Sequence, residues 1–367
     1  MLNKQKNGNI IPSPQSEEDK ELEQERRLKK AKRRRINTLL DRIFGFFLVT
    51  AIVIGCTGLA VEYIIIDGPS PSLKNIFTMT MLETRRFGFI PNIFLSQAEI
   101  DEIREANNTT VGADEMDSSL ISIPAVDEVV DKNGVDSYGL QDEDGDGIII
   151  LDIKGSTYVG YMLVVLDPTR VFLGEANFSS GIGYTLEQMV DVYDALGGIN
   201  AGGFQDDTGA GLGGVPGGLT FVNGFRYNYN SYSFCGFDAD GLMHVGSLDS
   251  VQAVEMGIVD GVTFGPVLVV NGEPANPDSF ESGVNPRTAI GQRADGAVLM
   301  LVIDGRQLHS VGASYQDLVD IMIDYGAVNA CNMDGGSSTC MYYGGQYVNS
   351  YSAATGARPL PTAWLVK

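Results

Sequence analysis

The residues best suited to chemistry form one loop near the C-terminus, where a carboxylate precedes two glycines and two serines. The loop reads Asp334-Gly335-Gly336-Ser337-Ser338 and follows an apolar run that is predicted to form a buried strand. Glycines beside a carboxylate let a ligand approach the backbone closely, and consecutive N–H groups in such a turn can bind an anion. The serine hydroxyls add hydrogen-bond donors. A Gly-Gly hairpin turn with an exposed aspartate is the alternative interpretation.

Two charged segments lie upstream of this loop. Arg287-Thr288 opens a predicted strand, where a guanidinium could grip an anion in a bidentate fork. A surface arginine is the alternative for this position. Asp304-Gly305-Arg306 lies between two apolar runs, which favours a hairpin turn. Asp304 is nevertheless kept as a candidate for a second catalytic carboxylate.

A third segment offers an amide, glycines and an aromatic ring, in the order Asn200-Ala201-Gly202-Gly203-Phe204. It overlaps the end of residues 185–201, which align without a gap with residues 314–330. Each copy predicts a capped amphipathic helix, a glycine that ends it, and a short buried strand. The match has two interpretations, either convergence of helix-to-strand connections or two pseudo-symmetric halves that share one site. In both cases the loops follow the ends of strands, where ligand sites tend to lie.

These residues must be positioned by a fold with short strands, which turn signals such as Asn271-Gly272 and Asp295-Gly296 separate. The predicted strands cover 148–153, 158–166, 219–223, 267–270, 297–303 and 341–347. Together with the two repeated helices they predict an α+β domain of mixed sheets over residues 138–367. Residues 67–137 are more polar and acidic and are predicted to form a stalk, with a short helix at 96–106 that begins with a capping box.

The N-terminal part of the chain predicts a membrane anchor. Residues 43–61 are uncharged, and the apolar stretch continues to residue 66, which is long enough to span a bilayer as a helix. Eight basic side chains between Arg26 and Arg35 precede it and favour a cytoplasmic position for residues 1–42. A cleaved signal peptide is the alternative. The sequence therefore predicts a single-pass protein with residues 67–367 outside the cell membrane.

Composition argues against several classes of function. The net charge is −22, which disfavours nucleic acid as a partner. Two histidines and four scattered cysteines form no zinc-ligand spacing, and three cysteines beyond the anchor (Cys235, Cys331 and Cys340) allow at most one disulfide. Asp142, Asp144 and Asp146 imitate the start of a calcium-binding loop, but Ile153 replaces its last acidic ligand. We therefore expect no cofactor and at most weak calcium binding there.

Taken together, the motifs resemble the phosphodiester glycosidase family over about residues 150–367. The likeness is densest between Arg287 and Ser338, where R-T-A-I-G, an Asp-Gly turn, a helix and an N-x-D-G-G loop follow in the family's order. Asn200 to Phe204 is similar to the family's N-x-G-x-F element. One departure is Ser337, which stands where the family has a third glycine. A Cβ there narrows the predicted anion nest and makes phosphate contacts at this point doubtful.

The resemblance implies hydrolysis of a sugar-1-phosphodiester, such as one of N-acetylglucosamine. It implies that Asp334 is the nucleophile or base, with Asp304 a second carboxylate or a turn residue. Arg287, together with the amides of Gly335 and Gly336, would hold the phosphate. The same resemblance gives the remaining candidates for substrate contacts as Thr288, Asn200, Gly203, Phe204, Ser337, Ser338 and Arg306.

With a cytoplasmic leader and an external body, the expected substrate is a phosphodiester-linked surface polysaccharide or a teichoic-acid-like polymer. Two alternatives are weighed against this function. A non-catalytic surface module could bind glycan in the same pocket, and it would not need a carboxylate at the reacting carbon. A phosphodiesterase could cleave the phosphorus side of the bridge, but such enzymes usually rely on metal clusters, and the sequence offers no convincing one.

Overall fold

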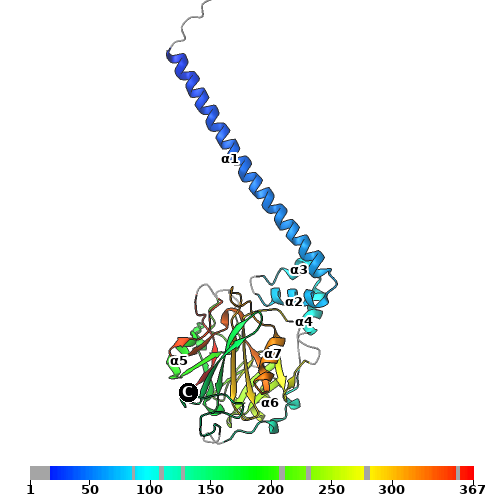
Figure 1. Cartoon of the computed structure of the whole chain (residues 1–367), viewed down its shortest axis with the longest axis vertical. Coiled ribbons are helices and arrows are strands. Elements are labelled where there is room, and N and C mark those ends of the chain that lie inside the picture. The colour runs from blue at the N-terminus through cyan, green and yellow to red at the C-terminus, as the bar shows by residue number, and fades with distance from the viewer. Residues whose placement is uncertain are drawn as a thin grey trace, which may run out of the picture. The chain divides into compact units, whose positions relative to one another are not determined.

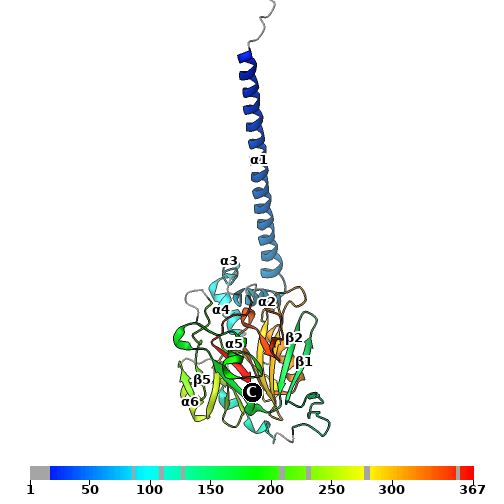
Figure 2. The ribbon, with the colours of Figure 1, turned by 90° about the vertical axis from the view of Figure 1, so that its left-hand side faces the viewer.

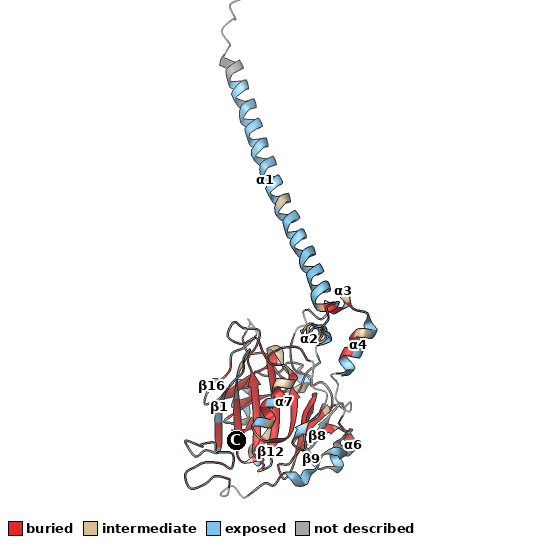
Figure 3. Ribbon diagram, turned by 45° about the vertical axis from the view of Figure 1, so that its right-hand side comes forward, coloured by how far each residue is buried: buried red, intermediate tan, exposed pale blue. Residues whose placement is uncertain are grey.

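The computed structural model describes residues 17–367 with gaps at 85–86, 107–110, 125–128, 206–210, 229–232, 277–281 and 353–355. The chain divides after Gly68 into two compact units. The first unit contains α1 (Glu17–Val61) and a π-helical turn, η1 (Glu62–Ile66). Helix α1 is continuous, exposed along almost its whole length, and long and apolar enough to cross a membrane (Figures 1 and 3). These properties agree with the predicted span at 43–66.

The second unit, Pro69–Lys367, contains three antiparallel sheets and six α-helices among its described residues (Figures 1 and 2). The helices are α2 (Pro71–Leu82), α3 (Pro91–Phe94), α4 (Gln97–Ala106), α5 (Leu186–Tyr193), α6 (Ser250–Glu255) and α7 (Tyr315–Asp324). The predicted α+β class with mixed helix and sheet content is confirmed.

The largest sheet has seven strands in the order β1-β2-β13-β12-β14-β10-β11. They are β1 (Ile148–Lys154), β2 (Val159–Val165), β10 (Val267–Val270), β11 (Glu273–Pro274), β12 (Arg287–Arg293), β13 (Val298–Ile303) and β14 (Ala327–Met333). The neighbouring strands β2, β13, β12 and β14 are almost entirely buried, because α7 covers one face of the sheet and the other sheets cover the opposite face. Figure 3 shows this buried centre in red.

A second sheet has the order β16-β15-β4-β17-β3, and a third has the order β6-β5-β9-β7-β8. The strands of the second are β3 (Val171–Glu175), β4 (Gly197–Asn200), β15 (Met341–Tyr343), β16 (Gln346–Tyr347) and β17 (Thr362–Val366). Those of the third are β5 (Thr220–Val222), β6 (Phe225–Tyr227), β7 (Ser233–Asp238), β8 (Met243–Ser247) and β9 (Ile258–Thr263). Side chains from all three sheets, including Leu163, Trp364 and Cys235, form one apolar core that holds the sheets together.

The repeated segments both form the predicted helix and strand. Thr185 caps α5 and Ser314 caps α7, each within a capping box. The strands that follow, β4 and β14, belong to different sheets, and both are fully buried. One detail differs, since α5 ends at Asp194 in the left-handed conformation and Gly197 already belongs to β4. The two loops beyond β4 and β14 nevertheless meet, because the Asp334 N–H donates to the Ala201 carbonyl at 3.0 Å.

Residues 69–137 differ from the predicted stalk, since the described residues of this range belong to the same compact unit as the sheets. The predicted helix and capping box are present, because Glu99 accepts from the N–H and hydroxyl of Ser96 at 2.9 and 2.8 Å. Helix α2 packs on the body through Thr80, whose hydroxyl accepts from the Val284 N–H at 3.3 Å. Gly283 lies so close to Thr80 that a Cβ there would meet its backbone at 2.4 Å. The composition of the segment gave no sign of this packing.

Candidate active site

A cavity of about 570 Å³ lies where the loops after β4 and β14 meet the start of β12. It is lined by residues of several separate segments, among them Glu83, Phe204, Phe264, Asn285, Arg287, Arg306, Tyr315, Asp334, Gly335, Gly336, Ser337 and Arg358. The structure thus brings together most of the residues that the sequence singled out. Among the charged lining residues, three arginines face two carboxylates.

Asp334 is the first residue after β14 and is only partly exposed. Its backbone is fixed on both sides, because the Asn200 side-chain amide donates to its carbonyl at 2.5 Å and its own N–H donates to Ala201. Burial raises the pKa of Asp334 to about 6, and the Ser338 hydroxyl, Arg358 and the Gly335 N–H act in the opposite direction. A carboxylate with such a pKa can exchange a proton near neutral pH, as a catalytic base must.

Asn200 and Thr288 position the loop rather than line the cavity. Both side chains are fully buried, at 0% exposure. The Asn200 amide oxygen accepts from the Thr288 hydroxyl at 2.8 Å and from the Cys340 N–H at 3.0 Å. These bonds tie β12 and β15 to the loop that carries Asp334. The expectation that both residues contact the sugar directly therefore does not agree with their placement.

The loop after Asp334 differs in shape from the predicted Gly-Gly turn. Gly336 has φ +63° and begins a short 3₁₀ turn, η7 (Gly336–Ser338), rather than a hairpin. Its N–H donates to the Pro286 carbonyl at 2.9 Å, so one of the two amides expected to hold a phosphate already has a partner. The Gly335 N–H lowers the pKa of the Asp334 carboxylate. A Cβ on Gly335 would lie 2.9 Å from the Pro286 carbonyl oxygen, so close backbone packing is what requires this glycine.

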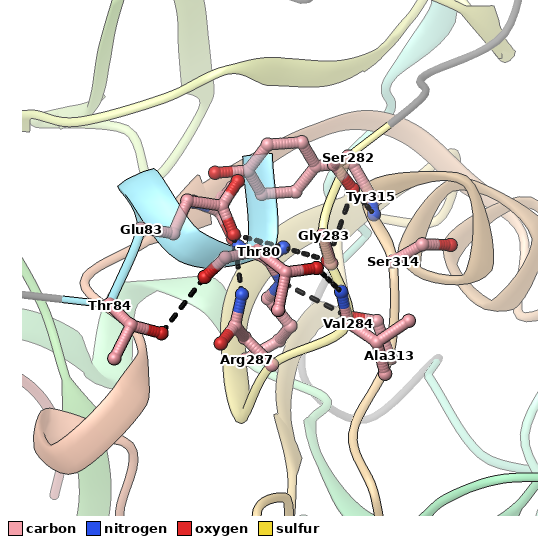
Figure 4. Close-up of polar contacts among 12 residues, drawn as sticks. Thr80, Glu83, Thr84, Ser282, Gly283, Val284, Arg287, Ala313, Ser314 and Tyr315 are labelled. Carbon is pink, nitrogen blue, oxygen red and sulfur yellow. Dashed lines mark hydrogen bonds and ion pairs between the residues drawn. The ribbon is translucent and has the colours of Figure 1, made fainter. Parts of the chain in front are cut away.

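Arg287 is held by a carboxylate from another part of the chain. The Glu83 Oε2 atom, at the end of α2, lies 2.8 Å from an Arg287 terminal nitrogen (Figure 4). The same oxygen accepts from the Asn285 amide at 2.6 Å. Arg287 also donates to the carbonyls of Gly283 and Ala313.

The Arg287 guanidinium stacks 4.0 Å from the centre of the Tyr315 ring and is 4% exposed. Burial alone would lower the pKa of Arg287, but the Glu83 charge raises it. A phosphate that bound Arg287 directly, as expected for this arginine, would have to compete with Glu83 for a buried group.

Arg306 and Arg358 come from different parts of the chain and both lie beside the loop that carries Asp334. Arg306 donates to the Asn285 amide oxygen at 2.8 Å, and a Cβ on Gly336 would lie 3.3 Å from its guanidinium. Arg358 donates to the Ser337 hydroxyl at 2.7 Å and stacks 4.4 Å from the centre of the Phe204 ring. Arg306 is exposed and Arg358 is partly exposed, so both are more accessible than Arg287.

Asp304 does not line the cavity. It is 2% exposed and accepts from the Asn349 amide at 3.1 Å and from the Ser350 N–H at 3.0 Å. Its other oxygen lies 3.2 Å from His309 Nε2. The predicted hairpin is also wrong, because β13 is followed by a loop that leads to α7 and not by a pairing strand. Asp304 therefore fixes the chain after β16.

Glu83, Arg358 and Phe264 line the cavity but were missed from the sequence. Glu83 lies in the supposed stalk, 204 residues from the arginine that it binds, and no local pattern reveals such a contact. Arg358 precedes Pro359 in a glycine-containing segment without periodicity. A search for charged residues just before β17, which pairs with β4, could have found Arg358.

Among the described residues, one group of three acidic side chains could hold a metal, namely Asp142, Asp144 and Asp146. The Asp142 carboxylate accepts from the N–H groups of Gly145 and Gly147, and Asp146 accepts from the Tyr343 hydroxyl. This loop is not part of the cavity lining. The cysteines Cys235, Cys331 and Cys340 are buried and unpaired, so the described fold contains no disulfide among them.

Comparison with known proteins agrees with the motifs. The family model for phosphodiester glycosidases matches residues 193–367, which confirms the resemblance for that part of the chain. The SPbeta prophage-derived uncharacterized protein YomE of Bacillus subtilis is 29% identical over 200 residues, which is 51% of this chain and 29% of that protein. The chain thus spans less than a third of the length of this curated relative.

Among solved structures, the chain resembles the zebrafish N-acetylglucosamine-1-phosphodiester alpha-N-acetylglucosaminidase catalytic domain, described as auto-inhibited by its pro-peptide. The TM-score is 0.51 with 21% identity, over 60% of this chain and 81% of that chain. At this identity the likeness establishes a shared fold.

Proposed function

We propose that this chain hydrolyses a sugar-1-phosphodiester, in which a phosphate bridges the anomeric carbon of a sugar and a second group. One observation carries the proposal. Asp334, with a pKa raised by burial to about 6, lines a cavity that also holds three arginines. A carboxylate and several cations in one cavity match a substrate that has an electrophilic carbon next to an anionic phosphate. The family match supports the same reaction class.

In the proposed reaction the bond between the sugar C1 and the bridging oxygen breaks. The leaving group is a phosphate monoester, which departs more readily than a sugar alkoxide and needs less help from a general acid. Asp334 either attacks C1 as the nucleophile, forming a glycosyl ester that water then hydrolyses to free sugar, or removes a proton from a water that attacks C1 directly. The transition state has oxocarbenium character in both cases. Positive side chains stabilise the charge that develops on the leaving phosphate. The buried Asn200 and Thr288 hold Asp334 in place for this step.

The substrate is proposed to be larger than a single sugar phosphate. A second cavity of about 760 Å³ shares Gly203, Phe204, Phe264 and Tyr315 with the first, and α4 contributes Arg104 to its lining. Together the two cavities provide room for the group beyond the phosphate. A surface polysaccharide or teichoic-acid-like polymer fits this space. Such a polymer would also be within reach of a catalytic unit that α1 anchors outside the membrane.

A substrate panel tests the proposal. The full chain in detergent is incubated with methyl phosphodiesters of N-acetylglucosamine, glucose and galactose 1-phosphate, and the products are identified by mass spectrometry. The expected products are free sugar and methyl phosphate. Sugar 1-phosphate and methanol would instead indicate cleavage on the phosphorus side. Binding of the esters without turnover would favour a glycan-binding module and contradict the proposal.

A further inference from the structure

We propose that Arg306 and Arg358 form the phosphate clamp of the site, and that Arg287 is a fixed part of its wall. The inference rests on the proposed function and assigns its phosphate subsite. It follows from which hydrogen-bond donors around Asp334 are already used and which are accessible.

Two backbone donors near Asp334 are occupied. The Gly336 N–H donates to Pro286, and the Ser338 N–H donates to the Gly335 carbonyl at 3.2 Å. The Gly335 N–H lowers the pKa of the Asp334 carboxylate. An anion that entered the cavity would have to break the first two bonds to use those N–H groups, so accessible side chains are its readier donors.

Arg287 is already neutralised by Glu83. Its Nε and one terminal nitrogen donate to Ala313, Glu83 and Gly283, and one face of its guanidinium lies on Tyr315. The Glu83 carboxylate would also repel a phosphate brought to the same place. The ion pair therefore acts as a nearly neutral surface of the cavity.

Arg306 and Arg358 have the geometry that a clamp requires. One lies against Gly336 and the other donates to Ser337, so the two guanidiniums approach the same 3₁₀ turn from different segments. Both guanidiniums line the same cavity as the Asp334 carboxylate. Two accessible cations beside this carboxylate suit the negative charge of a phosphodiester.

Local structure fixes both guanidiniums before a ligand arrives. Arg358 is held against the Phe204 ring, and Arg306 is held by Asn285. Arg306 also adopts φ +57°, a left-handed conformation that is uncommon for residues other than glycine and is often found at functional sites.

The test uses the full chain in detergent and two probes, inorganic phosphate and N-acetylglucosamine 1-phosphate, with affinities measured by calorimetry. Arg306→Gln and Arg358→Gln should each weaken both probes by about 10- to 100-fold, since each removes a charged hydrogen bond to phosphate. Arg306→Lys and Arg358→Lys keep the charge but lose the fork, so they should lie between wild type and the Gln variants. Lys154→Gln removes an exposed positive charge of β1 and is the matched control, which should leave affinity unchanged.

Kinetics separate a clamp from a merely structural role. Arg358 lowers the pKa of Asp334, so Arg358→Gln should move the acidic limb of the pH profile to higher pH and raise KM. Melting temperature shows whether each variant is folded. Unchanged phosphate affinity in folded Arg306→Gln and Arg358→Gln would overturn the clamp, as would loss of affinity in folded Arg287→Lys alone. Probe binding that depends on both arginines, in a protein that cleaves no ester, would retain the clamp and reject the proposed function.

Discussion

At the residue scale, Asp334 is held in a setting that opposes its ionisation. Burial raises its pKa from 3.8 to about 6, so the folded protein binds a proton more tightly than the unfolded chain between these values. The neighbouring Ser338 hydroxyl and Arg358 limit this effect without removing it. The ionised form of Asp334 is therefore less favoured than that of a solvated aspartate, and its carboxylate is more basic. A higher basicity is expected of a catalytic base.

The pH dependence of catalysis follows from this pKa. If Asp334 acts as nucleophile or base, only its ionised form is active, and log kcat/KM should rise with a slope of about one below pH 6 and level off above it. Measuring kcat/KM as a function of pH tests this predicted slope directly. A profile that falls as pH rises through 6 would instead assign Asp334 as a general acid.

The same pKa predicts an effect on stability. Because the folded-state value is raised, the favourable contribution of the protonated form is present below pH 4 and is lost as pH rises through 6. Asp334→Asn should therefore be more stable than wild type at pH 7.5 by about 1 to 2 kcal/mol, after allowance for partial solvent exposure, and not at pH 4. Urea unfolding at both pH values measures the difference. Equal free energies of unfolding for wild type and Asp334→Asn at pH 7.5 would mean that the ionised carboxylate does not destabilise the fold.

At the element scale, α2 is part of the site although it lies far from it in sequence. Glu83, directly after its last residue, contacts Arg287 (Figure 4). Glu83 also accepts from Asn285, and the Thr84 hydroxyl accepts from Arg306 at 3.3 Å. The exposed fractions of the Arg287 and Glu83 side chains are 4% and 17%, so this ion pair is largely buried. The positions of these cavity residues thus depend on a helix outside the part of the chain that matches the family model.

Glu83→Ala should destabilise the second unit by about 3 kcal/mol, because it leaves the buried charge of Arg287 without its partner. Thermal unfolding measures the change. Glu102→Ala on the exposed face of α4 is the matched control and should shift the midpoint little. A small effect of Glu83→Ala, similar to that of the control, would show that the pair is not a stabilising part of the fold.

Local patterns predicted the elements better than the contacts between them. The runs 148–153 and 267–270 became β1 and β10, and both repeated helices begin at their predicted hydroxyl caps. The strand predicted at 341–347 is divided into β15 and β16, because Gly344 and Gly345 both adopt positive φ and form a turn. Periodicity and capping are local properties, so the sequence carries them directly.

The site was only partly predictable, because many of its contacts join residues that are far apart in the sequence. Asp334, Phe204 and Arg306 line the cavity as expected, because they follow or flank strand ends. The buried roles of Asn200 and Asp304 depend on partners more than 40 residues away, such as Asp334 and Asn349, and no spacing rule reveals these partners. The partner of Arg287 lies in a segment whose composition resembled a linker.

At the scale of the whole molecule, the chain combines a long apolar helix with a separate compact unit. The uncharged residues 43–61 follow eight basic side chains, which predicts that the N-terminus is cytoplasmic and that residues 67–367 are outside. Protease added to intact cells should then degrade an epitope at the C-terminus and leave one at the N-terminus intact. Protection of the C-terminal epitope would contradict an external enzyme.

The most direct test of the central claim is the turnover of Asp334→Asn with a sugar-1-phosphodiester that the wild type cleaves. The side chain is nearly isosteric, so the variant should fold and keep the arginines in place. Turnover should fall by at least about a hundredfold, while the affinity for N-acetylglucosamine 1-phosphate holds or increases because a negative charge near the phosphate is removed. A folded Asp334→Asn variant with near-normal turnover would contradict the catalytic role of Asp334.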